Sequence, residues 1–268
     1  MAKRKQPTNK SKGINTLPPD ENILIIISET TTERGDLGNP PTPVASASEV
    51  TIISNYAGIL IANETRPKEK GTLGGVLVSD KGDLYGLTCF HTVKQNKDFT
   101  KFLPDESLKV ISEDGKEIGF FNADTAIINS KLDIALIKLS GKFHNKTIGS
   151  PTKIIDIKEA DKGTEVYFYN DRIKKKAKGF IIKVNQKGNW QLGKYENIIF
   201  VSNVMDEEVC ERISDEGDSG SWLLRVSDNA LVGVVFANSY EFTFVMPITE
   251  VIQAFQKKKI TLTLNLVP

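Results

Sequence analysis

Cysteine is scarce in this chain of 268 residues, where only Cys89 and Cys210 occur. Two such residues do not make the disulfide framework of a small secreted protein. We expect both to be thiols, with Cys89 a small buried residue. The first 20 residues are basic, but no apolar core follows their charges, which predicts no secretory signal. Both features favour a reducing environment and predict a cytoplasmic protein.

Histidine is equally scarce, since His91 and His144 are the only two in the sequence. A site built from several histidines is therefore excluded, and no cysteine–histidine spacing typical of zinc is present. The sequence predicts no metal site. His144 has polar neighbours on both sides and is expected to lie on the surface.

The chain also lacks an excess of either charge and a long apolar run. Its 35 basic and 34 acidic side chains leave a formal net charge of +1, which gives no overall attraction for nucleic acid or an anionic membrane. No apolar run reaches the roughly 18 residues of a membrane span. The basic run RIKKKAKG at 172–179 could contact a polyanion, but it has no interleaved aromatic residues and fits a solvated hairpin better. We expect neither nucleic acid nor a membrane as a partner.

Short runs rich in β-branched and aromatic residues dominate the sequence from Val50 onward. Gly, Asn and Asp interrupt them at intervals typical of antiparallel sandwiches and barrels, with almost no helical periodicity between them. The predicted strands form two groups of about six, separated by a connecting stretch at 141–162. They lie at 51–62, 72–79, 84–88, 107–112, 117–122 and 133–139, and then at 164–169, 179–185, 198–203, 221–226, 231–237 and 242–247.

The N-terminal part and the last predicted helix have patterns of their own. Residues 1–47 combine a polar tail, an apolar candidate strand at 22–28 and a linker with paired prolines. Near the other end, residues 249–256 have the apolar spacing of a helix, with Thr249 as the predicted N-cap.

The final run, 260–267, alternates between apolar and polar residues and predicts a half-buried strand. Thr261, Thr263 and Asn265 are expected to face solvent. The strand needs a partner, and the sequence leaves open whether that is strand 22–28, a barrel edge or another protein.

The stretch GDSGS at 217–221 places a serine between two glycines, which fits either a tight turn or an exposed nucleophile. A nucleophilic serine needs a base and an orienting carboxylate. His91 ends an apolar strand at a turn, and Asp133 opens a strand of apolar residues, where an unpaired charge would be costly. Asp124 also precedes an apolar run, but the context of Asp133 fits better. The candidates are therefore His91 as base, Asp133 as orienting acid and Ser219 as nucleophile.

In this order, the three segments resemble the catalytic segments of chymotrypsin/trypsin-like serine peptidases in their bacterial-type, disulfide-poor form. The resemblance is carried by GTLGGVLVSDKGDLYGLTCFHTV (71–93), LDIALIKL (132–139), GDSGS (217–221), LVGVVFANS (231–239) and FVMPITEVIQAF (244–255). It implies an all-β fold of two antiparallel six-stranded β-barrels, with a C-terminal helix and short extensions at both ends. The catalytic residues would lie in the cleft between the barrels.

The resemblance also implies domain boundaries. Residues 1–47 would form an N-terminal extension with a disordered tail, an extra strand and a linker. A peptidase domain would follow at 48–256, with its N-terminal barrel at 48–140 and its C-terminal barrel at 163–256. Residues 257–268 would form a C-terminal strand extension.

The family's roles carry over to matching positions of this sequence. Ser219 would attack the scissile carbonyl, His91 would transfer the proton and Asp133 would orient His91. The N–H groups of Gly217 and Ser219 would form the oxyanion hole. Asp218 would shape the loop through an internal partner.

The resemblance assigns substrate binding to four positions: Ile213, Phe236, Ala237 and Asn238. Ile213 stands where trypsin-like members carry the aspartate that selects Lys or Arg, so that preference does not carry over. Many secreted members have a serine on the cleft strand that touches the triad aspartate. The matching stretch, from Val235 to Ala237, has none.

The predicted function is that of a serine endopeptidase acting through an acyl-enzyme, with protein or peptide substrates and no cofactor. A peptidase of broad specificity would endanger its own cytoplasm. We therefore expect restricted specificity or an activating protein partner, as in bacterial stress or defence systems. The alternative is a catalytically silent trypsin-like binding or scaffold module, because a fold alone does not fix a function.

Overall fold

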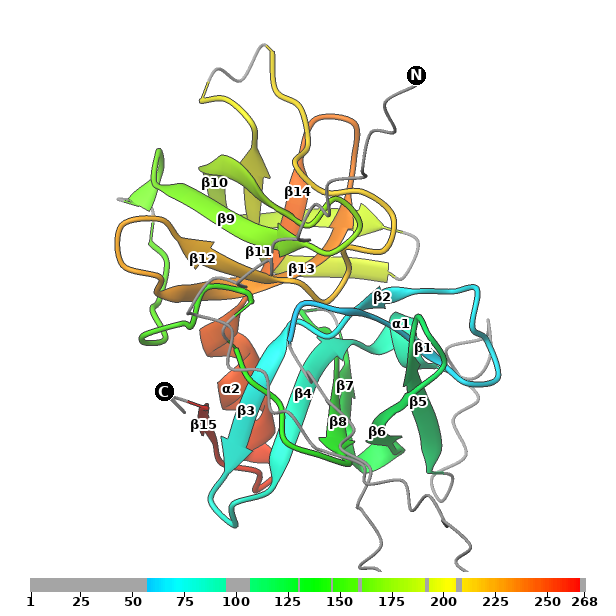
Figure 1. Cartoon of the computed structure of the whole chain (residues 1–268). Helices are drawn as coiled ribbons and strands as arrows, with labels where there is room; N and C mark the ends of the chain where they lie inside the picture. The colour runs from blue at the N-terminus through cyan, green and yellow to red at the C-terminus, as the bar shows by residue number, and fades with distance from the viewer. Residues whose placement is uncertain are drawn as a thin grey trace, which may run out of the picture. The chain divides into compact units, whose positions relative to one another are not determined.

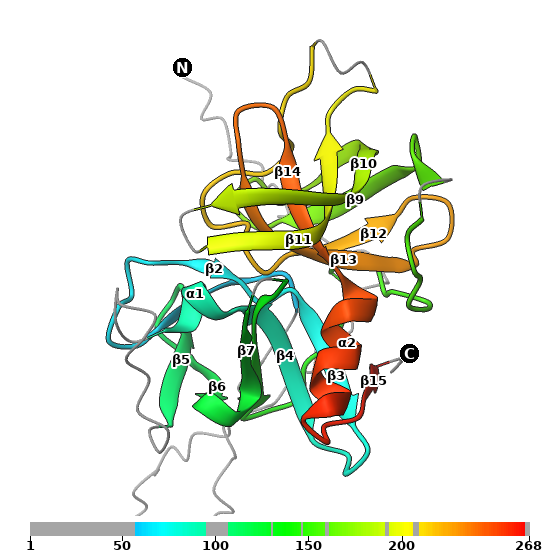
Figure 2. The same cartoon turned by 180° about the vertical axis from the view of Figure 1, so that it is seen from behind.

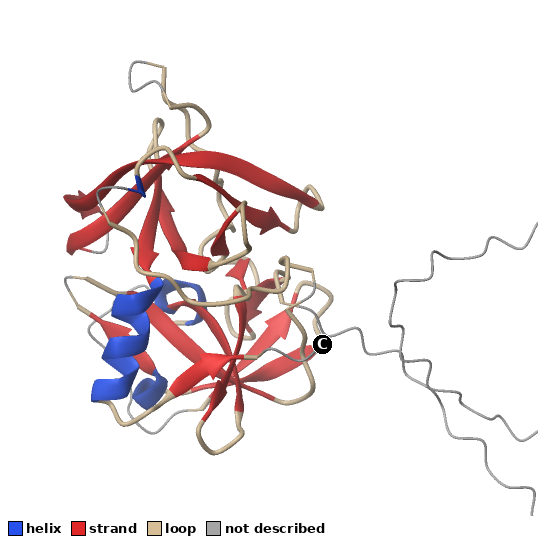
Figure 3. Ribbon diagram, turned by 90° about the vertical axis from the view of Figure 1, so that its left-hand side faces the viewer, coloured by secondary structure: helices blue, strands red, loops and turns tan. Residues whose placement is uncertain are grey.

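Strands account for most of the regular structure in the computed structural model, and helices are few (Figure 3). The chain divides into two units, Met1–Ser54 and Asn55–Pro268. All described residues belong to the second unit, and the predicted strand at 22–28 lies outside them. They are 57–94, 107–129, 131–145, 147–158, 161–190, 193–205 and 209–265. Within them, no helix is long and apolar enough to cross a membrane.

The first half of this unit is a nine-stranded antiparallel sheet, seen in the lower part of Figure 1. Its elements are β1 (Leu60–Asn63), β2 (Gly71–Thr72), β3 (Gly75–Ser79), β4 (Leu84–Cys89), α1 (Phe90–Val93), β5 (Leu108–Ser112), β6 (Glu117–Phe121), the 3₁₀ turn η1 (Ala123–Thr125), β7 (Ala126–Ile128), β8 (Asp133–Leu139) and β15 (Leu262–Leu264). Hydrogen-bonded neighbours follow the order β15–β3–β4–β8–β6–β5–β1–β2, and β7 also pairs with β8. Apolar side chains such as Leu77, Leu87 and Leu136 are fully buried and build its core.

The second half is a closed antiparallel barrel, seen in the upper part of Figure 1. Its strands are β9 (Glu165–Asn170), β10 (Lys175–Trp190), β11 (Gly193–Ser202), β12 (Trp222–Arg225), β13 (Leu231–Asn238) and β14 (Thr243–Pro247). They close in the order β10–β11–β14–β13–β12–β9, which removes every open edge. Buried β-branched side chains such as Val166, Ile181 and Val245 fill its interior.

The predicted all-β class is confirmed, although only the second half closes into a barrel. The predicted strand 72–79 is divided by Gly74 into β2 and β3. Strands β10 and β11 are longer than predicted, because their shared end is polar and carries no apolar alternation. Asn185 and Asn197 adopt positive φ angles of 55° and 60° in this part of the ribbon, where the β10–β11 register shifts.

The predicted helix is α2 (Ile248–Lys257), which follows β14 and runs alongside the first half of the unit (Figure 2). Its apolar face is buried, with Phe255 fully covered. The predicted N-cap is wrong: Pro247 holds that position, and the Thr249 hydroxyl instead donates to Asp156 Oδ1 at 3.1 Å. A proline is compatible with this place because a helix start needs no N–H there.

The C-terminal alternating run contributes β15, which pairs antiparallel with the edge strand β3. The sequence left three partners possible for this strand, and the structure pairs it with a sheet edge of the same chain. Thr263 is exposed as predicted, but the prediction for Asn265 is wrong because this residue is buried. Its backbone N–H donates to the carbonyl of Val76 at 3.3 Å, and its side-chain amide donates to the carbonyl of Phe143 at 3.3 Å.

Candidate active site

His91 and Asp133 meet where β4 passes into α1, in the region that faces the barrel (Figure 1). Cys89 at the end of β4 pairs with Ile134 of β8. His91 is two residues beyond Cys89, and Asp133 is the first residue of β8. The turn of α1 therefore brings the imidazole ring over the start of the neighbouring strand.

Both carboxylate oxygens of Asp133 accept hydrogen bonds from His91. Oδ2 lies 2.5 Å from the ring Nδ1, and Oδ1 accepts the backbone N–H at 3.1 Å. The Asp133 side chain is 0% exposed, whereas that of His91 is 26% exposed. A carboxylate can only accept, so the ring proton lies on Nδ1 and Nε2 is left as an acceptor. This is the tautomer that a general base requires.

The two competing candidates lie elsewhere. Asp124 is exposed in η1, where its backbone carbonyl accepts from Lys258 Nζ at 3.0 Å. His144 is half-buried rather than fully on the surface, and its backbone carbonyl accepts the N–H of Ala57 at 2.9 Å.

Ser219 lies on a tight loop that enters β12 of the barrel. Gly217 and Gly220 on either side have φ angles of +94° and +102°, which favour glycine. A Cβ on Gly220 would also lie 2.1 Å from the carbonyl oxygen of Thr72. The Ser219 hydroxyl donates to the carbonyl of Phe236 at 3.2 Å, and no hydrogen bond joins it to His91, although the structure describes both residues.

The GTLGG segment of the first half holds this loop from the other side. The N–H of Thr72 donates to the carbonyl of Ser219 at 2.7 Å, and its hydroxyl donates to the carbonyl of Gly217 at 2.8 Å. The hydroxyl of Thr88 fixes Thr72 in turn, by donating to its carbonyl at 2.8 Å. Sequence reasoning missed Thr72, and only its glycine-rich surroundings could have drawn attention to it.

The amides predicted to bind an oxyanion are available for that purpose. Within the described ranges, no acceptor meets the N–H of Gly217 or of Ser219. Their carbonyl groups are both bonded to Thr72, which fixes the orientation of the loop. The site therefore offers two fixed donors beside the serine hydroxyl.

Asp218 has the internal partners that the resemblance implied. Its Oδ2 accepts the N–H of Asp215 at 2.8 Å and the side-chain amide of Asn170, on β9, at 3.0 Å. Burial raises the pKa of Asp218 to about 6, while the Asp215 N–H and the charge of Arg172 oppose this shift. Sequence reasoning did not identify Asn170, which lies far from the loop in the chain.

The raised pKa of Asp218 predicts a pH dependence of stability. The folded protein binds the Asp218 proton more tightly than the unfolded chain does. The stabilisation of the fold by this proton is therefore fully present below the ordinary pKa of 3.8 and is lost as pH rises through about 6. The loss should amount to about 2–3 kcal/mol. In Asp218→Asn, the amide oxygen can accept both bonds and no proton is exchanged. Thermal unfolding from pH 4 to 7 should show Tm of the wild type falling relative to this variant. Parallel curves would contradict the prediction, and Asp124→Asn serves as an exposed control.

Cys89 and Tyr195 lie close to the buried carboxylate. Burial and then the charge of Asp133 raise the pKa of the Cys89 thiol, which donates to the carbonyl of Val235 at 3.3 Å. Burial, followed by the same charge, raises the pKa of Tyr195. Its ring packs 5.0 Å from that of Phe236 on β13.

Cys89, His91 and Asp133 are also a group whose ligand atoms lie within 4.8 Å of one another. All three are already engaged, because the histidine and aspartate bind each other and the neutral thiol binds a carbonyl. A metal would have to displace these bonds and remove the thiol proton. The arrangement fits acid–base chemistry better than metal binding.

Three of the predicted substrate-binding residues lie on β13 beside the serine. Phe236 presents its carbonyl to Ser219, Ala237 follows, and the amide of Asn238 donates to the carbonyl of Ser214 at 3.2 Å. The fourth, Ile213, is only partly buried, and its N–H donates to the hydroxyl of a threonine on β14 at 3.0 Å.

That threonine, Thr243, was missed by sequence reasoning. It is fully buried and its hydroxyl also accepts the N–H of Ser214 at 3.0 Å. With both lone pairs used, its proton goes to the Ser214 hydroxyl, 2.8 Å away. The segment before the serine loop is thus held by neutral hydroxyl groups.

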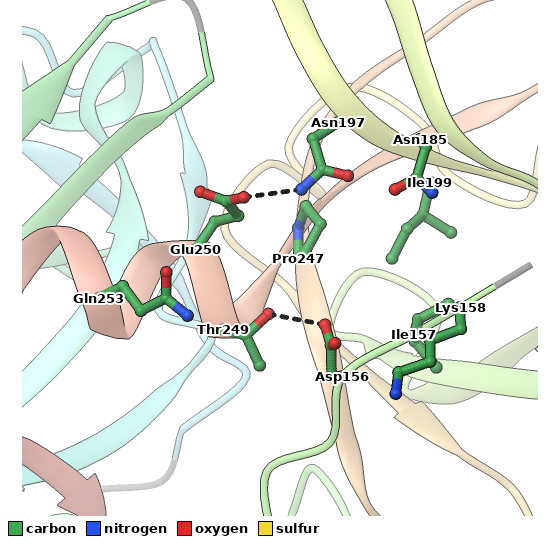
Figure 4. Close-up of a pocket in the computed structure, with 10 residues that line it drawn as sticks. All are labelled: Asp156, Ile157, Lys158, Asn185, Asn197, Ile199, Pro247, Thr249, Glu250 and Gln253. Atoms are coloured by element: carbon green, nitrogen blue, oxygen red, sulfur yellow. Dashed lines mark hydrogen bonds between the residues drawn. The ribbon is translucent and has the colours of Figure 1, made fainter.

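Two of the cavities that the described residues line are rich in polar groups. One, of about 430 Å³, lies between the barrel and α2 and is lined by polar groups that include Asn185, Asn197 and Glu250 (Figure 4). Asn197 donates to Glu250 Oε1 at 2.8 Å across it. The other, of about 380 Å³, includes Gly217 itself and so adjoins the candidate active site.

The chain has the chymotrypsin-like fold of bacterial serine proteases. Its parts are a nine-stranded antiparallel sheet, a closed six-stranded barrel and a C-terminal helix, and the histidine–aspartate pair and the serine loop lie on different halves. Similar solved structures include a Nocardiopsis protease (15% identity, 77% of this chain and 97% of the other, TM-score 0.52). Protease A of Thermobifida fusca is 14% identical, over 78% of this chain and 98% of its own, with a TM-score of 0.53. A glutamic acid-specific serine protease is 17% identical, over 78% of this chain and 100% of its own, with a TM-score of 0.52.

These likenesses establish the fold alone, because the identities are low. No protein-family model and no curated protein sequence matches the chain. The activity therefore has to be argued from the arrangement of the residues.

Proposed function

We propose that the protein is a serine endopeptidase with His91, Asp133 and Ser219 as its catalytic triad. One observation carries the proposal: a fully buried aspartate gives both its oxygens to His91, at 2.5 Å and 3.1 Å. Burying a carboxylate is costly unless it is fully paired. A pair that leaves the outer ring nitrogen as an acceptor beside a serine loop is well suited to nucleophilic catalysis.

The reaction follows from these roles. Ser219 Oγ attacks a substrate carbonyl while His91 Nε2 takes the hydroxyl proton, and Asp133 stabilises the imidazolium. The N–H groups of Gly217 and Ser219 bind the oxyanion, each contributing about 3–4 kcal/mol in the transition state. Collapse expels the amine, which takes the proton from His91. Water then attacks the acyl-enzyme by the same route and releases the acid.

Restricted activity is part of the proposal, and the hydrogen bond of the serine hydroxyl supports it. The Ser219 hydroxyl donates to the Phe236 carbonyl, so it must turn toward His91 before attack. A substrate or an activating protein that favours the rotated state would switch the enzyme on. Such control suits a peptidase that works in the cytoplasm, as in bacterial stress or defence systems. The same hydrogen bond favours the second candidate, a catalytically silent binding module.

Two observations bear on substrate choice. Ile213 offers no negative charge to a lysine or arginine side chain. One similar structure is that of a glutamic acid-specific protease that uses a histidine triad in substrate binding, and this chain has only two histidines in all. We propose that neither of these specificities applies unchanged.

A fluorophosphonate probe separates the two candidates, because it reacts with an activated serine hydroxyl. We expect the wild type to be labelled on Ser219 and Ser219→Ala to remain unlabelled. Ser227→Ala removes an exposed serine of the β12–β13 turn and should be labelled like the wild type. Absence of labelling in the wild type would favour the silent module.

A further inference from the structure

The cavity beside Gly217 is rich in charged side chains. Its charged lining consists of Lys68, Lys70, Glu113, Arg172 and Glu216. They come from the β1–β2 connection, the β5–β6 turn, the β9–β10 hairpin and the serine loop. Three cations and two carboxylates thus surround a hollow at the edge of the candidate oxyanion hole.

The serine loop contacts the cavity through Gly217 and contacts β13 through Ser219. On one side of the loop, the Phe236 carbonyl of β13 contacts the Ser219 hydroxyl. On the cavity side, a Cβ built on Gly217 would lie 3.6 Å from Cδ2 of Leu60, which also lines the hollow. If the acyl part of a substrate lies along β13, beside the predicted substrate-binding residues, the part beyond the cleaved bond passes Ser219 and Gly217 and reaches this cavity. Its occupant would be the part of the substrate that leaves as the amine.

The cavity has one cation more than it has carboxylates, and its ion pairs leave two of the cations without a close partner among the described residues. Glu113 pairs with Lys70 and also attracts Lys174 of the neighbouring hairpin. Arg172 has only a long contact, 3.7 Å, with Asp215.

Within the described ranges, Lys68 has no ion-pair partner, and neither has Glu216 on the opposite side. Both are exposed, as are Lys70 and Arg172. The cavity therefore holds one unpaired cation, Lys68, one weakly paired cation, Arg172, and one unpaired carboxylate, Glu216. A carboxylate-bearing ligand would gain more here than it loses.

We infer that this cavity selects substrates with aspartate or glutamate in the first few residues after the cleaved bond. The inference rests on the proposed peptidase function and adds a substrate class to it. It also gives the basic run at 172–179 a role, because Arg172, its first residue, lies in the cavity. Exposed ion pairs are weak, so the preference for an acidic residue over its amide should be about two- to fivefold. It should diminish as salt is added.

The test is digestion of a peptide pool followed by sequencing of the new N-termini. In the wild type, Asp and Glu should be enriched about two- to fivefold over Asn and Gln within the first three positions. The enrichment should fall to about one in Lys68→Gln/Arg172→Gln and should rise in Glu216→Gln, which removes a repelling charge. Lys81→Gln changes an exposed lysine of the β3–β4 turn and should keep the wild-type ratio.

The possible failures are distinguishable. Cleavage that requires Ser219 but shows no acidic preference would overturn the inference and leave the peptidase intact. Absence of Ser219-dependent cleavage would overturn the proposed function. In that case the tripeptide amides Ala-Asp-Glu and Ala-Asn-Gln, titrated into ¹⁵N-labelled Ser219→Ala protein, decide the matter. A shift of the Gly217 amide with the acidic peptide alone would support the cavity, and equal or absent shifts would overturn it.

Discussion

Ser219→Ala and His91→Ala should each abolish peptide hydrolysis, with turnover lowered by about 10⁴- to 10⁶-fold. The first variant removes the attacking oxygen, and the second removes the group that takes its proton. Both variants should still fold. The serine hydroxyl makes one hydrogen bond, to Phe236, so the Tm of Ser219→Ala should stay within a few degrees of the wild-type value. His91→Ala should unfold at a lower temperature, because it leaves Oδ2 of the buried Asp133 without its ring partner.

The measurement is turnover of a cleaved peptide, together with thermal unfolding of each variant. The double variant should be no slower than either single one, because the two residues act as a unit. His144→Ala and Ser227→Ala change residues outside the site and should keep wild-type turnover. If either site variant retains more than a few per cent of activity, the assignment of that residue is wrong.

The sequence allowed the fold class to be predicted and His91, Asp133 and Ser219 to be proposed as site residues, because both depend on local patterns. Alternating apolar runs determine strands, and glycines flank a loop that needs positive φ angles. The structure brings His91 and Asp133 into contact and places Ser219 on a loop held by Thr72. The hydrogen bond of the Ser219 hydroxyl is beyond a local pattern, because the carbonyl that accepts it lies 17 residues further along.

Residues that support the site from a distance could not be predicted in the same way. Asn170 contacts Asp218 across 48 positions, and Thr72 contacts Gly217 across 145. Each is an ordinary polar residue in its own strand, and only the folded contact gives it a role. Asn265 illustrates the same limit, because alternation predicted exposure and the pairing of β15 with β3 buried it.

These supports have a common chemistry. The serine loop is held by hydroxyl and amide groups from Thr72, Asn170 and Thr243. Both cysteines are free, and within the described residues no ion pair joins Asp218 to a cation. Neutral hydrogen bonds of this kind contribute about 1 kcal/mol each and are not screened by salt. The loop is therefore held by several modest contacts, which is consistent with a site whose final alignment depends on a bound substrate or partner.

Asp133→Asn should lower turnover by about 10⁴-fold while the ring of His91 stays in place. The backbone N–H of His91 is an obligatory donor and lies 3.1 Å from Oδ1, so the new amide must turn its oxygen toward it. Its NH₂ group then faces Nδ1 of the ring, where Oδ2 stood at 2.5 Å.

A donor at that place forces Nδ1 to accept, so the ring proton moves to Nε2 and the nitrogen that should take the serine proton is blocked. Both ends of the amide remain paired, and the fold should survive with a modest change in Tm. Asp124→Asn makes the same chemical change at the exposed competing aspartate and should leave turnover unchanged. ¹⁵N NMR of the histidine ring provides the decisive readout, since it distinguishes the two tautomers directly. A proton that remains on Nδ1 in Asp133→Asn, or turnover within tenfold of the wild type, would show that Asp133 does not set the state of His91.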